Sequence, residues 1–428
     1  MTTVKLRWRM VSLLFVGGLI NYIDRAALSV AAPQVAADLH LSPGQMGIVF
    51  SGFFVGYALF NFIGGWAADR FGAKRVMSVA MAAWSMFCGL TALTGSFVSL
   101  FLVRTMFGMA EGPLATTINK MVNNWFPHRQ VATALGLANC GLPLGGAISG
   151  PLIGLLLAYL GWRASFAFVP LLGLTWLVFW MLGTTDKPRQ HPHISATELQ
   201  DIESNRPVPV GEDQRAEGLG YYLRQPAIVA AMISYFGYSY ILFFFLTWFP
   251  SYLTIERGLS LKSMSLATTL PWLVGFIGYG ASGWLSDRVF DRTGNALTAR
   301  KWVLIGCLGT SALFIALAGL VTTTASALLL VSGAVLALYL SGSTYWAIIQ
   351  DVVPSAKVGS VGGLVHAVAN CAGIFGPTIT GYLVEGTGSF SSAFFLAGGV
   401  ALLGVGAVLL LIRPIPLPGP SPRTVVAR

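Results

Sequence analysis

The sequence predicts an all-α membrane protein with twelve transmembrane helices arranged in two six-helix bundles. Two observations predict this fold class. Of the 428 residues, 55% are hydrophobic and only 10% are charged, and the mean hydropathy is +0.71. The hydrophobic residues form runs of about 20, the length of a helix that crosses a ~30 Å hydrocarbon core. A soluble domain needs a larger polar shell, so we expect a multi-pass membrane protein.

The apolar runs divide into two sets of six. The first set lies near residues 10–32, 46–67, 76–95, 97–121, 131–158 and 164–182. The second set lies near residues 227–254, 264–285, 302–321, 325–350, 359–384 and 391–412. None of these runs is the alternating segment of about 10 residues that is typical of a membrane β-barrel.

A polar stretch separates the two sets. It holds several prolines and many charged side chains, together with a short amphipathic segment around Ser195 to Ser204. We therefore predict an N-terminal bundle at 1–182, a cytoplasmic linker at 183–224, a C-terminal bundle at 225–413 and a cytoplasmic tail at 414–428.

The basic residues predict the orientation of the chain. All but five of the 26 Lys and Arg residues fall in the termini and in alternate connections; the exceptions are Arg163, Arg257 and Lys262 on the other side, and Arg25 and Arg104 inside spans. This asymmetry is typical of cytoplasmic loops. We expect both termini in the cytoplasm, a place in the cell (inner) membrane and contact with the lipid bilayer. Nucleic-acid binding is not expected, because the basic residues do not gather on one accessible face.

Four charged residues lie inside the first and fourth spans. Asp24 and Arg25 are adjacent in the first, and Arg104 and Glu111 are seven residues apart in the fourth. Each such charge costs at least about 2.5 to 3.5 kcal/mol in a bilayer, which favours a functional role. Depth along the helices pairs Asp24 with Arg104 and leaves Glu111 about 10 Å further along. The alternative is a structural quartet of neutralising ion pairs, although such pairs stabilise weakly compared with apolar packing.

This group of charges offers a route to coupled transport. A buried carboxylate beside an arginine is held in its charged form by that arginine. When an anionic substrate takes over the arginine, the carboxylate holds a proton more readily, and the reverse order follows from the same linkage. The four charges therefore predict symport of an organic anion with H⁺.

A second motif occurs twice at equivalent places in the two sets. Gly-Trp-x-x-Asp-Arg closes the second span at 65–70 and the eighth span at 283–288. Such duplication is typical of internally repeated transporters, and glycine lets two helices approach closely. We expect a conformational latch on the cytoplasmic side, formed by Gly65, Asp69, Arg70, Gly72, Asp287 and Arg288. The alternative is that these residues only mark helix ends and topology.

Several motifs together resemble one transporter family. They are Asn21-Tyr22-x-Asp24-Arg25, Gly56-Tyr57-Ala58-Leu59, Arg104 to Glu111 with Trp125-Phe126-Pro127 after it, Phe245 to Leu253, and Trp346. On these residues the chain is similar to the anion:cation symporter family of the major facilitator superfamily, which includes bacterial galactonate, hexuronate and glucarate transporters. The resemblance covers the chain except the linker and tail, and it implies the major facilitator fold.

The resemblance also implies roles for individual residues. Asp24 and Glu111 match the proton-titrating carboxylates of the family. Arg25 and Arg104 match its arginines at the central cavity, which handle the substrate carboxylate. Other positions of the cavity are matched by Tyr57, Asn139, Trp346 and Asn370.

The chain departs from the family pattern at some positions. His366 stands where sugar-acid members have an amide, and Leu142 stands near the place of a glutamine in the galactonate transporter. His366 either titrates or stays a neutral hydrogen-bonded histidine. The seventh span lacks the third arginine of the vesicular glutamate carriers, which argues against a dicarboxylate. We expect the second half to read substrate shape through Trp346, Gln350, His366 and Asn370.

These observations predict a secondary active transporter. We expect proton-coupled symport of a small organic monoanion, a sugar acid such as an aldonate or hexuronate, by alternating access. Aromatic-carboxylate symport and organic-anion exchange are the alternatives. An enzyme is not expected, because no span supplies a nucleophile with its base or a metal cluster. The four cysteines have no metal or disulfide spacing, so we expect no cofactor and no metal, and we expect a monomer.

Overall fold

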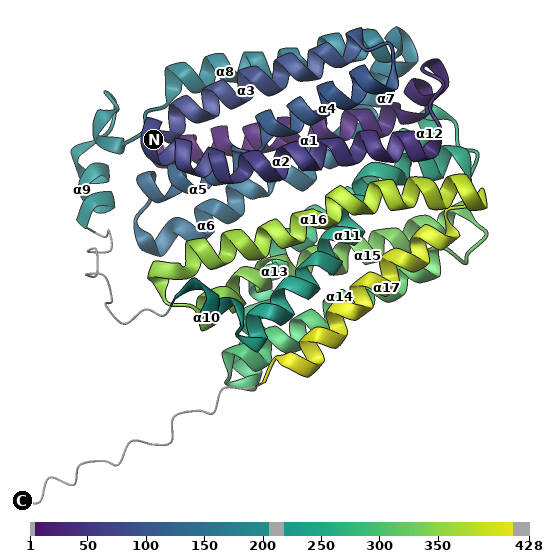
Figure 1. The fold of residues 1–428 in the computed structure, drawn as a ribbon. Coiled ribbons are helices and arrows are strands. Elements are labelled where there is room, and N and C mark those ends of the chain that lie inside the picture. Colours follow the sequence, from purple (N-terminus) through teal and green to yellow (C-terminus); the bar gives the residue numbers. More distant parts are fainter. Residues whose placement is uncertain (1–4, 205–217, 414–428) are drawn as a thin grey trace, which may run out of the picture.

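The computed structural model describes residues 5–204 and 218–413, and its regular elements there are all helices (Figure 1). The predicted tail at 414–428 and part of the predicted linker, 205–217, lie outside the described residues. Within the described part, ten helices are long and apolar enough to cross a membrane. The chain is therefore a multi-pass membrane protein, as its composition predicted.

The first group of helices comes before the linker. It comprises α1 (Leu6–Asp38), α2 (Pro43–Phe71), α3 (Ala73–Leu90), the 3-10 turn η1 (Thr91–Leu93), α4 (Phe97–Glu111), α5 (Leu114–Trp125), α6 (His128–Asn139), α7 (Gly141–Phe168) and α8 (Pro170–Gly183). Serine residues form the N-caps of two of these helices. The hydroxyl of Ser42 accepts a hydrogen bond from the N–H of Gln45, and the hydroxyl of Ser96 accepts one from the N–H of Ser99.

The second group follows the linker. It comprises α11 (Pro226–Ile255), α12 (Leu261–Ala267), α13 (Thr269–Thr293), α14 (Ala296–Ala318), α15 (Thr324–Val352), α16 (Ser355–Thr387) and α17 (Ser391–Leu411). Between the groups lie η2 (Pro188–Gln190), α9 (Ala196–Ser204) and α10 (Leu219–Leu223). The helix α9 is the short segment that the sequence predicted there.

Several predicted spans are interrupted. The fourth is divided into α4 and α5 at Gly112-Pro113, because proline lacks the N–H that would continue the helix. The fifth and sixth fall in one apolar stretch, Thr133–Gly183, whose 51 residues are too long for one crossing. The chain breaks inside this stretch at Gly161, whose φ of 73° suits glycine. The eighth is shared by α12 and α13, and α13 is not among the ten apolar helices.

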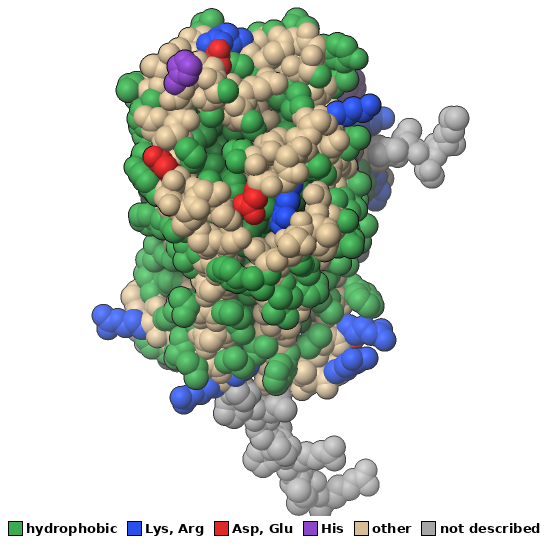
Figure 2. Space-filling model, turned by 90° about the vertical axis from the view of Figure 1, so that its right-hand side faces the viewer, with side chains coloured by type: hydrophobic (Ala, Val, Ile, Leu, Met, Phe, Trp, Pro, Cys, Tyr) green, Lys and Arg blue, Asp and Glu red, His purple; other side chains and the backbone are tan. Residues whose placement is uncertain are grey.

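The helices run between two sides of the molecule, which we name by their connections. The linker side carries the start of α1 and the linker helix α9, on the left of Figure 1. The opposite side carries the connections at 39–42 and 256–260 and lies on the right of Figure 1. The first group forms the upper part of the figure and the second group the lower part. Figure 2 looks onto the opposite side, where charged side chains are few and scattered.

The linker is fastened to the first group. Glu198 of α9 accepts hydrogen bonds from the backbone N–H groups of Leu6 and Arg7, both at 3.0 Å, and so caps the start of α1. The buried Arg7 side chain donates to Asp201 at 2.7 Å. Asp186 accepts from the backbone N–H of Lys74 at 2.7 Å, at the start of α3. Residues 184–204 therefore belong structurally with the helices that precede them.

Candidate functional site

An ion pair joins α1 to α4 at the centre of the first group. Arg25 donates from Nε and Nη2 to one oxygen of Glu111, at 3.0 and 2.8 Å. Arg25 is 8% exposed and Glu111 is fully buried. The second oxygen of Glu111 has no hydrogen-bond partner among the described residues. Glu111 therefore neutralises Arg25 but retains the capacity to accept another hydrogen bond or a proton.

Asp24 lies beside this pair without joining it. Its side chain is fully buried, and neither carboxylate oxygen has a hydrogen-bond partner in the described part of the chain. The indole of Trp84 and the thiol of Cys88, both on α3, are its neighbours. An ionised carboxylate without a partner is costly to bury. The described structure therefore offers an ionised Asp24 no hydrogen bond to offset that cost.

The predicted pairing of Asp24 with Arg104 is not the one that forms in the described structure. Adjacent residues on a helix point about 100° apart, so Asp24 is directed toward α3 while Arg25 is directed toward α4. Depth along the helix carries no information about this rotation. The residue that meets an acid is Arg25, and the acid is Glu111.

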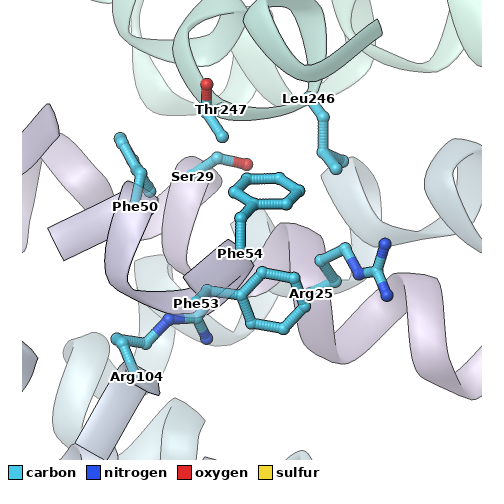
Figure 3. Close-up of a pocket in the computed structure, with 8 residues that line it drawn as sticks. All are labelled: Arg25, Ser29, Phe50, Phe53, Phe54, Arg104, Leu246 and Thr247. Atoms are coloured by element: carbon cyan, nitrogen blue, oxygen red, sulfur yellow. The ribbon is translucent and has the colours of Figure 1, made fainter. Parts of the chain in front are cut away.

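Arg104 is held by aromatic rings. Its guanidinium carbon lies 4.6 Å from the Phe107 ring and 5.4 Å from the Phe53 ring. The guanidinium of Arg25 lies 4.8 Å from the same Phe53 ring. Figure 3 shows Phe53 between the two arginines. Such contacts are attractive because the ring face is electron-rich, so Phe53 contributes favourable interactions to both cations.

A small cavity adjoins the two arginines. Its lining includes Arg25, Ser29 and Arg104 from the first group and Leu246 and Thr247 from α11 (Figure 3). Its volume of ≈ 10 Å³ is about that needed for one water molecule. The cavity is therefore too small for an organic substrate, and it marks where the two groups meet over the charges.

Tyrosines complete the surroundings of Arg25. The ring of Tyr57, a predicted cavity residue on α2, lies 4.8 Å from the guanidinium carbon. The ring of Tyr22 lies 5.2 Å from it. Tyr22 and Arg25 are three residues apart, so they share a face of α1. Tyr22 also contacts Trp272 of α13 edge-on, with ring centroids 5.7 Å apart. It so connects the second group to Asp24, Arg25, Arg104 and Glu111, which we call the charged cluster.

The predicted residues of the second group form an aromatic wall. The His366 ring lies 6.4 Å from Trp346 and 5.6 Å from Tyr235, centroid to centroid. Tyr235 stacks on Tyr345 at 4.3 Å. Asn370 is buried and donates to the backbone carbonyl of His366 at 2.9 Å. The Nδ1 atom of His366 is buried without a hydrogen-bond partner among the described residues.

Two predicted site residues stand apart from these clusters. Asn139 ends α6 and is half-buried, and Gln350 is exposed near the end of α15. Neither side chain forms a hydrogen bond with another predicted site residue in the described structure. The structure thus assembles Asp24, Arg25, Arg104, Glu111 and Tyr57 in one cluster and Trp346, His366 and Asn370 in another.

Close packing seals the opposite side between α2 and α16. Glu385 of α16 accepts from the N–H of Gly44 at 2.8 Å and from the hydroxyl of Ser42 at 2.9 Å. A methyl group on Gly47 would come within 2.5 Å of the carbonyl of Pro377. Such backbone approach requires small residues. The two groups are therefore in contact along this edge.

A second seal on the opposite side joins α7 to α12 and α13. A methyl group on Gly146 would come within 2.5 Å of the Trp272 ring, and one on Gly150 would come within 2.5 Å of the Ser265 carbonyl. Aromatic pairs reinforce the closure nearby: Phe54 of α2 lies 4.4 Å from Phe243 of α11. The charged cluster is thus closed off from the opposite side.

The linker side carries the predicted latch residues at the ends of α2 and α13. The predicted latch residues do not bridge the groups among the described residues. Asp69 pairs with Lys120 of its own group at 2.6 Å, and the guanidinium of Arg288 lies 5.6 Å from the ring of Trp284 in its own helix.

The glycines of the first latch motif differ in what they do. Gly72 has a φ of 91°, which favours glycine, and Asp186 lies directly beside it. Gly65 lies against Thr116 at ordinary contact distance. The close approach to the next helix is made by the preceding residue, Gly64, where a methyl group would come within 2.5 Å of Pro113.

Sequence reasoning missed several residues of the charged cluster. Phe53 and Trp84 were not predicted, because apolar aromatic residues are common in spans and carry no distinctive signal. Tyr22 had a usable signal, its position three residues before Arg25 on the same helix face. Phe53 likewise lies four residues before Tyr57.

Comparison with known proteins identifies the family. The family model described as Major Facilitator Superfamily matches residues 14–365 and 291–427. A hexuronate transporter of Bacillus subtilis is 50% identical over 404 residues, covering 94% of each chain. A D-galactonate transporter of Escherichia coli is 29% identical over 420 residues, covering 96% of each chain.

A solved structure shows the same fold. It is a bacterial homologue of the human lysosomal transporter Spinster, matched with a TM-score of 0.75 over 96% of this chain and 98% of the other, at 16% identity. Together with the sequence relatives, it indicates a transporter and not an enzyme. The chain belongs to the Major Facilitator Superfamily.

Proposed function

We propose that this transporter carries a sugar-acid monoanion, a hexuronate or an aldonate, together with H⁺ by alternating access. Two relatives reported above are transporters named for hexuronate and D-galactonate, which supports a sugar acid as substrate. The single observation that carries the coupling is the charge arrangement. Arg25 is neutralised by Glu111, while Asp24 and Arg104 are buried without an ion-pair partner within 4 Å among the described residues.

The coupling follows from competition for Arg25. A substrate carboxylate that binds Arg25 displaces Glu111, because the two carboxylates compete for the same guanidinium group. Glu111, displaced in a site that excludes water, is accommodated at least cost by taking a proton. Binding of the anion and of the proton are then linked, each favouring the other. Asp24 is the second proton-carrying group in this proposal.

The remaining site residues divide the substrate between the two groups. Arg25 and Arg104 receive the carboxylate, and we infer that Tyr57 and Asn139 contact the substrate, although neither lines the small cavity of this structure. On the second group, we infer that hydroxyl groups of the sugar acid contact Trp346, His366 and Asn370 of the aromatic wall and Gln350 outside it. The cations of the second group lie near helix ends in the described residues, which supports a monocarboxylate over a dicarboxylate.

The proposal includes the arrangement in the membrane. We infer twelve spans, with an N-terminal bundle at 1–182, a linker at 183–224 and a C-terminal bundle at 225–413, and we infer a monomer. The excess of basic residues on the linker side supports cytoplasmic termini. With this orientation, the seals on the opposite side support a state that is closed to the outside.

We infer that the latch forms in the state of the transport cycle in which the linker side is closed. Gly65, Asp69, Arg70, Gly72, Asp287 and Arg288 lie on the linker side, where Asp69 and Arg288 contact residues of their own group. We infer that they meet the opposite group when the linker side closes. In that role they govern the rate of interconversion and not the choice of substrate.

Uptake by purified protein in proteoliposomes tests the proposal. We expect radiolabelled D-glucuronate or D-galactonate to accumulate when the outside is acidic, and we expect a protonophore to abolish the accumulation. Counterflow that proceeds without any dependence on the pH gradient would instead establish the exchanger. Competition by benzoate but not by sugar acids would establish an aromatic-carboxylate carrier.

A further inference from the structure

A groove on the surface of the second group lies between α16 and α17, with α11 as its floor. Both helices pack extensively on α11 but scarcely touch each other, and Figure 1 shows them diverging toward the linker side. The groove has a volume of ≈ 440 Å³. Apolar side chains of all three helices line it, among them Val229 and Phe236 of α11, Val368 of α16, and Val400 and Leu403 of α17.

The groove lies within one half of the bilayer. All three helices are long and apolar enough to span a membrane. Val229 and Phe236 come three and ten residues after Pro226, where α11 begins on the linker side. At 1.5 Å per residue, these positions are about 4.5 and 15 Å from the helix start. In a ~30 Å core the groove is therefore at the depth of the leaflet on the linker side.

Basic residues lie at the linker-side ends of all three helices. Arg224 comes two residues before α11, Lys357 is in the first turn of α16, and Arg413 comes two residues after α17. Tyr221 of α10 is 52% exposed beside Arg224, as aromatic residues at a membrane interface are. Cations at this level attract anionic lipid headgroups.

We propose that this groove binds one acyl chain of an anionic phospholipid from the leaflet on the linker side. The described residues that line the groove are all apolar, and a sugar acid needs polar groups for its recognition. The acyl chain enters the groove where α16 and α17 diverge toward the linker side. The cations at the helix ends favour an anionic headgroup. This site is separate from the charged cluster and does not depend on the proposed function.

The bound acyl chain would contact α16. Val368 of this helix lines the groove, while His366 and Asn370 of the same helix belong to the aromatic wall. The same helix forms the seal with α2 through Glu385. A lipid wedged between α16 and α17 therefore contacts the helix that carries both features, and we expect it to change the transport rate.

Native mass spectrometry of the full chain tests the site. We expect the wild-type protein, released from detergent after extensive washing, to retain one phosphatidylglycerol and to lose phosphatidylcholine. Val400→Trp fills the groove and should abolish the retained lipid. Leu402→Trp is the matched control, because Leu402 is 52% exposed on the same helix and does not line the groove; it should retain the lipid.

Further variants keep the test decisive. Should Val400→Trp fail to give a monodisperse protein, Val368→Phe fills the same groove from α16. Joint replacement of Arg224, Lys357 and Arg413 by Gln should remove the preference for phosphatidylglycerol, whereas Arg75→Gln, an exposed cation of the first group on the same side, should not. Equal lipid retention by Val400→Trp and Leu402→Trp would overturn the proposal. A dimer that Val400→Trp disrupts would also overturn it, since the groove would then bind a second copy of the chain.

Discussion

Arg25 donates two hydrogen bonds to a single carboxylate oxygen of Glu111, from Nε at 3.0 Å and from Nη2 at 2.8 Å. The other oxygen of Glu111 is buried without a partner among the described residues. A bidentate arginine–carboxylate pair would engage both oxygens. This pair uses one, so the second oxygen can receive a proton while the first is still near Arg25.

Glu111→Gln should abolish uptake driven by a pH gradient. The amide cannot titrate, and it leaves Arg25 buried without an anion. Removing one partner of a buried ion pair costs about 3 to 5 kcal/mol, so we also expect a lower melting temperature. Substrate anion should restore part of that temperature, since its carboxylate can replace Glu111 at Arg25. Glu203→Gln, in an exposed pair of the linker, should leave uptake unchanged. Gradient-driven uptake that survives in Glu111→Gln would remove Glu111 from the coupling.

Asp24→Asn should separate coupling from binding. Asparagine mimics the neutral acid, and Asp24 has no hydrogen bond or ion pair to lose among the described residues. We therefore expect normal thermal stability, substrate counterflow close to wild type, and no accumulation against a gradient. Both transport modes are measured in the same proteoliposomes. A large fall in melting temperature would show instead that Asp24 is ionised and paired in the resting protein.

Phe53→Ala should weaken both stability and anion binding. The ring is 1% exposed and contacts both guanidinium groups. Truncating a buried phenylalanine costs about 3 to 5 kcal/mol, and here two like charges also lose the ring that separates them. We expect a lower melting temperature and a raised KM. Phe62→Ala is the control, because Phe62 is 83% exposed. A lower melting temperature with unchanged KM would show that Phe53 only packs.

The hydrophobic pattern predicted the helices, and the cost of buried charge predicted the central cluster. Asp24, Arg25, Arg104 and Glu111 were identified because the cost of placing ionisable groups inside spans favours a functional role. The partner of each charge was not predictable. Pairing depends on how helices rotate about their axes, and one residue along a helix changes direction by about 100°.

Other features had no local signal at all. The two seals on the opposite side join residues that are far apart in sequence, such as Gly47 with Pro377 and Gly146 with Trp272. A glycine in a span predicts a close approach but not its partner. The division of the fourth span does have a local signal, because Gly112-Pro113 is a recognisable helix breaker.

Glu385→Ala should loosen the seal on the opposite side. The carboxylate accepts from the hydroxyl of Ser42 and from the N–H of Gly44 at the start of α2 in the other group, so its loss leaves the N–H of Gly44 without this acceptor. In a Ser51→Cys reporter, whose position is buried at this seal, we expect faster labelling by a membrane-impermeant maleimide. Glu256→Ala is the matched control, because Glu256 accepts from Phe390 within its own group. Equal labelling rates in the two variants would show that Glu385 does not hold the seal.

Glu198→Ala should destabilise the first group without affecting coupling. Glu198 is 6% exposed and accepts from the first two N–H groups of α1, and loss of a helix cap costs about 1 kcal/mol. Because α1 carries Asp24 and Arg25, a frayed start could also displace the charged cluster. The two effects are distinguishable: fraying alone lowers the melting temperature and leaves the pH dependence of uptake intact. Glu203→Ala removes an exposed carboxylate from the same helix and should change neither. A shifted pH dependence in Glu198→Ala would show that the linker sets the position of α1 in the membrane, and residues 184–204 would then be part of the transport machinery.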